Sequence, residues 1–524
     1  MQIDEYLDHY AAINPELAFV QHEQRVLTYK EASAEVSAAS TQLQIMDLKR
    51  GDRFAVLSKN SVESYLSYFV ASRAGAVAVP LNFRLNPKEW IYILEDSECK
   101  LLIVDEHFRD PFNTVRSEFS GEVKYVSEVF ASWQEQPNEP NKPNEPNRKN
   151  TEQNPRTSTL SVSLEDPLIQ MYTSGTTGMP KGVIISQRAL LASIDLFTST
   201  TQTEESKELT LVCAPLFHVA AAVSSLAAVT QGNSILIHAD FSPDGVVTAV
   251  SKQQVTRMLV VPVMIQACIS YLSAQTDADL SSVKSISYGA SAISETVLTK
   301  ALELFACNFF QAYGMTETTG IATILDAEDH LRAINDSPHL LLSAGRPAMD
   351  TEIKIVDSEG VEVAEGDIGE ILIRGPQLMT GYWKRKPLDD KGGWLRTGDA
   401  AFRDQEGYLY IRDRINDMII SGGENIYPVE VESILMSHPK ITDAAVIGIP
   451  SDQWGEIVHA IVVREQNSEL TEEELTMYCK DSLAGYKCPK AVDFVDALPR
   501  NAAGKVLKKD LREPHWNGRS RRIG

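Results

Sequence analysis

The chain has 524 residues and a formal net charge of −23, from 49 Lys and Arg against 72 Asp and Glu. This length exceeds the size at which one hydrophobic core stops growing, so at least two domains are expected. The apolar share of 43% and the charged share of 23% are those of an ordinary globular protein. The acidic balance argues against nucleic acid as a partner, because nothing would offset the repulsion from phosphates.

The N-terminus, the apolar runs and the cysteines indicate the cellular compartment. The N-terminal residues show no basic segment followed by an apolar run, so no secretory signal is predicted. No stretch approaches the roughly 18 apolar residues of a membrane span, so stable membrane insertion is not expected. The six cysteines form no CxxC pair and predict reduced thiols of a cytoplasmic protein, not a disulfide frame or a zinc site. They are Cys99, Cys213, Cys268, Cys307, Cys479 and Cys488.

Short apolar runs alternate with amphipathic stretches in the first 130 residues. Strands are predicted at 53–57 and 101–104 and a helix at 61–73, which favours a layered α/β domain. Residues 134–156 break this pattern with a polar repeat, Pro-Asn-Glu-Pro-Asn-Lys followed by Pro-Asn-Glu-Pro-Asn-Arg. A segment with nothing apolar to bury cannot offset the entropy of ordering, so 134–156 is predicted to be a disordered loop.

The last ~110 residues are predicted to form a separate, small α+β unit. Its expected elements are a helix at 428–437, strands at 444–449 and 460–464, and a helix at 471–483. The tail after Leu511 is basic and lacks periodicity, so it is expected to be frayed.

The most informative stretch reads Thr-Ser-Gly-Thr-Thr-Gly-Met-Pro-Lys-Gly over 173–182, between predicted strands at 168–172 and 182–185. Glycines let backbone N–H groups approach an anion, while hydroxyls and a lysine add donors and charge. It is not a Walker A loop, because Pro180 stands where that motif requires glycine. The alternative is a polar hairpin turn. The residues predicted to bind phosphate are Thr173, Ser174, Gly175, Thr176, Thr177, Gly178 and Lys181.

Six further motifs follow: Pro215-Leu-Phe-His218, Tyr288-Gly-Ala-Ser-Ala292, Gln311-Ala-Tyr-Gly-Met-Thr-Glu317, Trp394-Leu-Arg-Thr-Gly-Asp399, the stretch from Asp413 to Pro428, and Pro499-Arg-Asn-Ala-Ala-Gly-Lys505. In content and order, over nearly the whole chain, the set resembles the adenylate-forming (ANL) superfamily, in its branch of acyl-CoA synthetases and AMP-dependent ligases. The resemblance implies an α/β fold with a large N-terminal domain of layered α/β subdomains plus a distorted β-barrel, and a small mobile α+β C-terminal domain. The N-terminal ATP- and acid-binding domain would span 1–415, and the swivelling C-terminal domain 416–524.

The resemblance also implies roles for individual residues. Lys505 would neutralise charge between the carboxylate and the α-phosphate, Thr316 would donate to that phosphate, and Glu317 would bind Mg²⁺. Asp399 would accept from the ribose hydroxyls, with Arg414 as a second contact. The further residues implied at the nucleotide are Gly289, Ala290, Ser291, Gln311, Ala312, Tyr313, Gly314 and Ile411.

Each of these residues also has an ordinary structural interpretation. Lys505 stands near Lys508 and Lys509, and a lysine in a charged run is usually solvated. Thr316-Glu317 is a common helix start, and an aspartate after a glycine, such as Asp399, is common in turns.

The resemblance assigns His218 to acid binding at a gate, although a lone histidine is more often a satisfied, partly buried residue. Gly422 and Gly423 would let a pantetheine arm pass close to the backbone, or would simply form a turn. Asn416 occupies the pivot position, where relatives commonly have Asp or Lys. Gln187 replaces a histidine that relatives often carry after the phosphate loop.

The gate segment 216–222 contains no acidic residue to pair with an ammonium group, which disfavours an amino-acid substrate. Alanines at 220–222, 290 and 292 leave apolar space, which favours a fatty or aromatic acid over a dicarboxylate that would want a nearby Arg. We expect a medium- or long-chain fatty acid, with an aromatic acid left open.

The expected reaction uses ATP and Mg²⁺ to form an acyl-adenylate and pyrophosphate, and then transfers the acyl group to coenzyme A. The alternative acceptor is a separate acyl-carrier protein. A different class is a non-catalytic nucleotide-binding protein, which would be expected to have lost Lys505, Glu317 or the loop hydroxyls. The sequence carries no signal for an oligomeric state.

Overall fold

The computed structural model describes residues 1–130, 162–173, 179–201, 208–273, 278–290, 293, 295–385, 392–415, 417–422, 424–465, 468–500 and 506–516. The chain forms two compact units. The first unit comprises Met1–Leu342, Pro347–Thr351 and Gly375–Gly393, and the second comprises Ser343–Arg346, Glu352–Arg374 and Trp394–Gly524. The predicted disordered loop at 134–156 lies outside the described residues.

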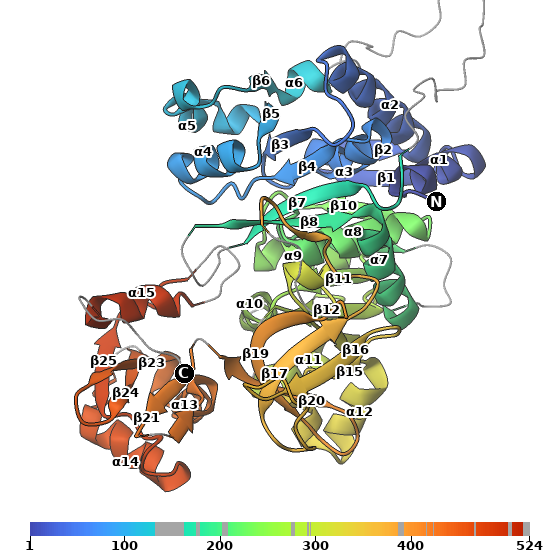
Figure 1. The fold of residues 1–524 in the computed structure, drawn as a ribbon. Coiled ribbons are helices and arrows are strands. Elements are labelled where there is room, and N and C mark those ends of the chain that lie inside the picture. Colours follow the sequence, from blue (N-terminus) through green and yellow to red (C-terminus); the bar gives the residue numbers. More distant parts are fainter. Residues whose placement is uncertain are drawn as a thin grey trace, which may run out of the picture. The chain divides into compact units, whose positions relative to one another are not determined.

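The larger sheet has nine strands, and those in its middle run parallel. Helices connect them (Figure 1). Because β12 and β13 are parallel neighbours, residues at their carboxyl ends emerge at one edge of the sheet. In spatial order the strands are β15 (Arg346–Pro347), β14 (Thr323–Leu325), β13 (Asn308–Tyr313), β12 (Ser285–Gly289), β11 (Arg257–Val260), β9 (Leu209–Val212), β10 (Ser234–Ile237), β1 (Ala18–His22) and β2 (Arg25–Thr28).

The second sheet of this unit has seven strands. One end consists of antiparallel strands, where β7 pairs with β8 and β8 with the short β18. The order is β18 (Gly381–Tyr382), β8 (Lys181–Ser186), β7 (Pro167–Thr173), β4 (Val77–Pro80), β3 (Arg53–Leu57), β5 (Cys99–Val104) and β6 (Glu122–Tyr125).

Local signals fix where the helices of the first unit begin and end. The Ser61 hydroxyl accepts from Ser64 N at the start of α3, and Gly75 ends α3 in the left-handed region at φ +64°. Thr28 and Glu31 form a capping box at the start of α2. The helices are α1 (Ile3–Ile13), α2 (Tyr29–Ile45), α3 (Val62–Ala74), α4 (Pro87–Asp96), η1 (Glu106–Phe108), α5 (Arg109–Asn113), η2 (Arg116–Glu118), α6 (Val126–Val129), α7 (Gln187–Thr201), α8 (Val219–Thr230), α9 (Pro243–Gln253), α10 (Pro262–Ser273), α11 (Glu295–Phe305), η4 (Thr316–Thr318), α12 (Ala327–Asn335) and η5 (Pro338–Leu342).

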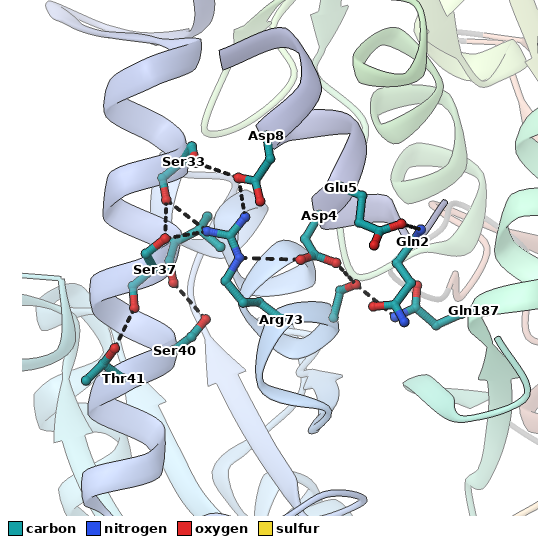
Figure 2. A network of polar contacts seen from close by, with 12 residues as sticks. Gln2, Asp4, Glu5, Asp8, Ser33, Ser37, Ser40, Thr41, Arg73 and Gln187 are labelled. Carbon is teal, nitrogen blue, oxygen red and sulfur yellow. Dashed lines mark hydrogen bonds and ion pairs between the residues drawn. The ribbon is translucent and has the colours of Figure 1, made fainter. Parts of the chain in front are cut away.

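A polar network joins α1, α2 and α3 to the first residue of α7 (Figure 2). Arg73 of α3 donates to Asp4 and Asp8 of α1 and to the Ser37 hydroxyl of α2. Gln187 Nε2 donates to Ser72 Oγ at 2.8 Å, and Ser72 donates in turn to Asp4. Gln187 is 1% exposed, so it has a packing role at the start of α7.

The second unit contains two sheets. Four antiparallel strands form the first, in the order β16 (Glu352–Val356), β17 (Gly369–Arg374), β19 (Leu395–Arg403) and β20 (Leu409–Arg414). The other has the order β22 (Glu424–Ile426), β21 (Ile419–Ser421), β24 (Gly455–Arg464) and β23 (Ile441–Ser451), with β25 (Ala491–Val495) also paired to β24. The helices are α13 (Pro428–Met436), α14 (Glu472–Ser482), α15 (Lys508–Arg512) and η6 (Glu513–Trp516).

A partly buried ion cluster connects α15 to the rest of the second unit. Lys508 Nζ lies 2.9 Å from Glu432 Oε1 and 3.6 Å from Asp413 Oδ2. Burial lowers the pKa of Lys508, but Glu432 and Asp413 outweigh burial and raise it overall. Arg512 pairs with Asp417, so α15 contacts both sides of the predicted pivot position.

The structure confirms the α/β fold class and the predicted elements at both ends of the chain. The expectation of a frayed tail after Leu511 is wrong for residues 512–516, because η6 forms there and Trp516 Nε1 donates to Gly448 O at 3.0 Å. The distorted barrel and the domain boundary at 415/416 stay predictions. Among the described residues, no helix is both long and apolar enough to span a bilayer.

Candidate active site

The predicted phosphate loop connects the two strands of a hairpin. Thr173 ends β7 and Lys181 begins β8, and the two residues pair across the hairpin. This pairing agrees with both interpretations of the stretch, since a phosphate loop and a plain turn would each occupy the hairpin end. Residues 174–178 lie outside the described residues.

A buried carboxylate lies beside this hairpin. Glu317 stands in η4 and is 6% exposed, and its Oε1 accepts from the Tyr382 hydroxyl at 2.7 Å. The Glu317 carbonyl accepts from Met379 N at 2.9 Å. Lys181 Nζ lies 5.5 Å from the centroid of the Tyr382 ring. The structure therefore joins the predicted lysine and the predicted Mg²⁺ ligand through a tyrosine that sequence reasoning missed.

Sheet register explains how Tyr382 reaches this position. Strand β18 pairs with β8, with Tyr382 opposite Val183, two residues from Lys181. Tyr382 and Glu317 are 65 residues apart in the sequence, so only the strand pairing brings them together. The one signal for Tyr382 in the sequence is the aromatic pair after Gly381, which marks a packed position but not a partner.

Glycines bring β12, β13 and η4 close together. A Cβ on Gly289 would lie 2.4 Å from Ala312 O on the neighbouring strand, and a Cβ on Gly314 would lie 2.4 Å from Gly320 O. Ala290 follows β12 with φ +67°, a conformation that costs energy for a residue with a side chain. These close approaches fix the segment 289–290 beside the carboxyl end of β13, where the adenine side was predicted.

His218 precedes the first residue of α8, where its backbone N donates to Pro215 O at 3.0 Å. Burial, and to a lesser degree Arg84, lower the pKa of His218 to about 4, so the ring is neutral near pH 7. Its Nε2 is buried and has no hydrogen-bond partner within the described part of the chain. A neutral ring with an unused nitrogen suits a binding role better than proton transfer.

The predicted ribose contacts pair with each other in the second unit. Arg414 Nε lies 2.8 Å from Asp399 Oδ1, and the two residues face one another on β19 and β20. Asp399 is 6% exposed and follows Gly398, whose φ is +71°. Ile411 lies on β20, three residues before Arg414.

Two family models match the chain. The AMP-binding enzyme model matches residues 7–383, and the model of the AMP-binding enzyme C-terminal domain matches residues 430–505. The chain belongs to the AMP-binding enzyme family. This confirms the adenylate-forming superfamily, and the matched segments include the hairpin, Glu317 and Tyr382.

The similar proteins of the AMP-binding enzyme family act on different acids. One is a fatty acid–[acyl-carrier-protein] ligase, ScoC, from Streptomyces coeruleorubidus, 32% identical over 98% of this chain and 96% of its own length. Another is a feruloyl-CoA synthase from Amycolatopsis sp, 35% identical over 96% of both chains. The structure is similar to o-succinylbenzoate coenzyme A synthetase (MenE) from Bacillus subtilis in complex with ATP and magnesium ion, with a TM-score of 0.82 and 30% identity, covering 97% of this chain and 98% of that one. Together these matches support a ligase that activates an acid and transfers it to coenzyme A or a carrier protein.

An apolar cavity of about 40 Å³ lies in the first unit between α7, α8 and the edge formed by β12 and β13. Gln311 lines it, and the side-chain oxygen of Gln311 is buried without a partner among the described residues. Of the alanines expected to provide apolar space, Ala220 lines this cavity. A second cavity of about 20 Å³ shares Phe197 and Leu259 with the first, so the two are neighbours.

An arginine lines the smaller cavity, but it has a partner. Arg257 Nε lies 2.5 Å from Glu208 Oε2, and both side chains are buried. Because Glu208 offsets the charge of Arg257, the cavity does not present a net positive group to a second substrate carboxylate.

Gly422 in the predicted thiol-tunnel region has φ +61°, and its N donates to Trp454 O at 2.8 Å. A Cβ on Gly422 would approach the Trp454 ring to 2.9 Å, so only glycine fits there. Trp454 is 49% exposed and was missed by sequence reasoning.

The structure describes only part of the predicted site. Thr316 lies beside Glu317 in η4, and Tyr313 ends β13. The site residues that lie outside the described residues are Ser174, Gly175, Thr176, Thr177, Gly178, Ser291, Asn416, Gly423 and Lys505.

Proposed function

We propose that this member of the AMP-binding enzyme family converts a medium- or long-chain fatty acid to an acyl-adenylate and then to a coenzyme A thioester. The observation that carries the proposal is the buried Glu317 carboxylate, which Tyr382 fixes beside the hairpin that bears Lys181. A buried carboxylate next to a cationic, hydroxyl-rich turn is suited to a metal ion and a polyphosphate.

In the first step, a substrate carboxylate oxygen attacks the α-phosphorus of ATP, the bond to the β-phosphate oxygen breaks, and pyrophosphate leaves. Two anions must approach each other, so positioning and charge neutralisation supply most of the catalysis. We assign Lys181 and the hydroxyls of 173–177 to the phosphates, and Thr316 to the α-phosphate. Asp399 and Arg414 are assigned to the ribose.

The donor set around Glu317 fits Mg²⁺, which prefers carboxylate, phosphate and water oxygens. When bound, the ion would neutralise phosphate charge and polarise the reacting phosphoryl group. The Tyr382 hydroxyl holds one carboxylate oxygen of Glu317, which fixes the direction in which the other faces.

Lys505 is assigned to the charge that develops between the acid and the α-phosphorus. A swivel at Asn416, the start of the proposed C-terminal domain 416–524, would then replace Lys505 with the loop at Gly422 and Gly423 for the second step. In that step the thiol sulfur attacks the acyl carbon and AMP leaves.

The apolar cavity supports an acid with an uncharged tail. Its lining by Phe197, Val223 and Ile321 offers apolar contact, and the partnered Arg257 removes the reason to expect a dicarboxylate. A feruloyl-type aromatic acid is the competing substrate class.

Pyrophosphate exchange with a panel of acids tests the proposal. Fatty acids of about 8 to 16 carbons should support exchange with a higher kcat/KM than aromatic acids, because each buried methylene contributes about 0.8 kcal/mol. Better exchange with aromatic acids would overturn the substrate class. No exchange with any acid would favour the non-catalytic alternative.

The acceptor is tested with the acid that the panel selects. Coenzyme A should yield a thioester, whereas product formed only with a separate acyl-carrier protein would favour the second candidate, which the similarity to ScoC supports. Lys505→Ala should abolish adenylate formation while thioester formation from a supplied adenylate stays largely intact. Equal loss of both steps would remove the role assigned to Lys505.

A further inference from the structure

A cluster of two histidines and an aspartate lies in the second unit, apart from the residues assigned to the reaction. Strands β24 and β25 are parallel, with His459 opposite Ala491 and Ile461 opposite Asp493. Since alternate residues of a strand face the same side, His459 and Asp493 lie on one face of the sheet. His459 Nε2 is 3.1 Å from Asp493 Oδ2.

The C-terminal segment adds the third member of the cluster. Trp516 Nε1 donates to Gly448 O on β23, and Gly448 pairs with Val458, the residue before His459. This bond holds η6 against the sheet and places the His515 ring with its centroid 4.9 Å from that of His459. Each of the three residues offers a ligand atom, and these atoms all lie within 4.8 Å of one another.

We propose that His459, Asp493 and His515 form a binding site for a divalent transition-metal ion of the zinc class. Two imidazoles and one carboxylate are a common donor set for such ions, which bind nitrogen and oxygen at about 2.0–2.2 Å. Tetrahedral ligands at that distance lie roughly 3.4 Å apart. The exposed side chains of Asp493 and His515 can rotate by the small amount that this needs, while the buried His459 stays fixed.

The geometry favours a site over an accidental surface contact for two reasons. His459 is 3% exposed, and its Nε2 lies 3.1 Å from Asp493 Oδ2, so a buried imidazole nitrogen already faces the cluster. The other two members come from separate elements, and the bond from Trp516 orders the segment that carries His515 before any ion binds. Asp493 and His515 are exposed, which leaves a fourth ligand position open to water.

Binding at this site would fasten the segment 506–516 to the sheet formed by β23, β24 and β25. In the sequence this segment directly follows Lys505. The ion would therefore act on the mobility of the chain next to the predicted catalytic lysine without taking part in the chemistry.

The test is a titration of the metal-stripped full-length protein with Zn²⁺ in millimolar Mg²⁺, followed by calorimetry and thermal unfolding. Millimolar Mg²⁺ occupies sites built from oxygen donors, such as the one expected at Glu317. The wild type should bind one equivalent of Zn²⁺, and a hundredfold excess over Kd should raise Tm by about 2 to 3 °C. In parallel, Co²⁺ should give a visible absorption band typical of nitrogen and oxygen ligation.

The variants His515→Ala and Asp493→Asn should each weaken Zn²⁺ binding at least about tenfold and remove the Co²⁺ band. His438→Ala is the matched control, because this histidine packs on Tyr478 in the same unit and lies outside the cluster. Its Zn²⁺ affinity should stay within about twofold of the wild type. Both ligand positions are exposed, so in the absence of Zn²⁺ the variants should keep the wild-type circular dichroism spectrum and pyrophosphate exchange.

Two results would overturn the proposal. In the first, the wild type binds no Zn²⁺ at a one-to-one ratio, which would mean that His459 and Asp493 form a hydrogen bond only. In the second, both ligand variants retain the wild-type affinity, which would place the bound ion elsewhere.

Discussion

Both compact units contain buried carboxylates, but their partners differ. In the first unit, Glu317 accepts from a neutral phenol, Tyr382. In the second unit, Glu432 and Asp413 lie around the ammonium group of Lys508. A hydroxyl orients a carboxylate without cancelling its charge, whereas a buried cation cancels it. Burial alone therefore does not identify a metal ligand, and the partner separates a carboxylate whose charge could hold a metal ion from one whose charge a cation already offsets.

The largest effect is expected at Lys508. Lys508→Ala would leave Glu432 and Asp413 buried without their cation, so the free energy of unfolding should fall by about 3–5 kcal/mol. Urea unfolding of the variant measures this loss, with the exposed neighbour Lys509→Ala as control. A loss below about 1 kcal/mol in Lys508→Ala would show that the cluster is not structural.

In the first unit, the variant to compare with Lys508→Ala is Glu317→Gln. The substitution keeps the shape and the partner of the side chain but removes the charge, so adenylate formation should fall on the order of a thousandfold while Tm changes little. Pyrophosphate exchange over a range of Mg²⁺ concentrations measures this effect. Wild-type activity at saturating Mg²⁺ would place the ion on other ligands.

A pH experiment extends the comparison to a buried base. The folded pKa of His218, about 4, lies below the ordinary value of 6.5, so the unfolded chain binds more protons between these values. The neutral His218 therefore contributes to the free energy of unfolding. Its contribution is complete above pH 6.5 and is lost as the pH falls toward 4. The total is roughly 3 kcal/mol, of which about 2 kcal/mol should be gone by pH 5.

The reference for this experiment is His218→Gln, which lacks the titrating group. The difference in unfolding free energy between wild type and variant should shrink from pH 7.5 to pH 5. A constant difference would mean that folding leaves the pKa of His218 unchanged, and the binding role assigned to a buried, neutral ring would need revision.

The smallest effect is expected at Tyr382. Tyr382→Phe removes the hydroxyl that orients Glu317 and keeps the ring near Lys181. Exchange should fall about tenfold, with a higher Mg²⁺ requirement, because a residue that supports a metal ligand typically contributes 10- to 100-fold. The exposed Tyr486→Phe is the matched control. An unchanged Mg²⁺ requirement would assign Tyr382 to packing alone.

The sequence by itself determined the local elements and the family. Strand β3 begins and ends where the apolar run 53–57 predicts, and α3 lies between the capping Ser61 and Gly75. These features were predictable because an apolar period and a cap depend on residues only a few positions apart. The motif order likewise predicted an acid-activating ligase, since each motif is a short stretch of the chain.

Only the tertiary structure decided which side chains meet. Tyr382 reaches Glu317 through the pairing of β18 with β8, and the Lys508 side chain lies between two acids, Glu432 and Asp413. His459 and His515 are 56 residues apart in the sequence and come into contact through the fold. No spacing rule covers such pairs, because their contact depends on sheet register and on the packing of segments that are far apart in the sequence.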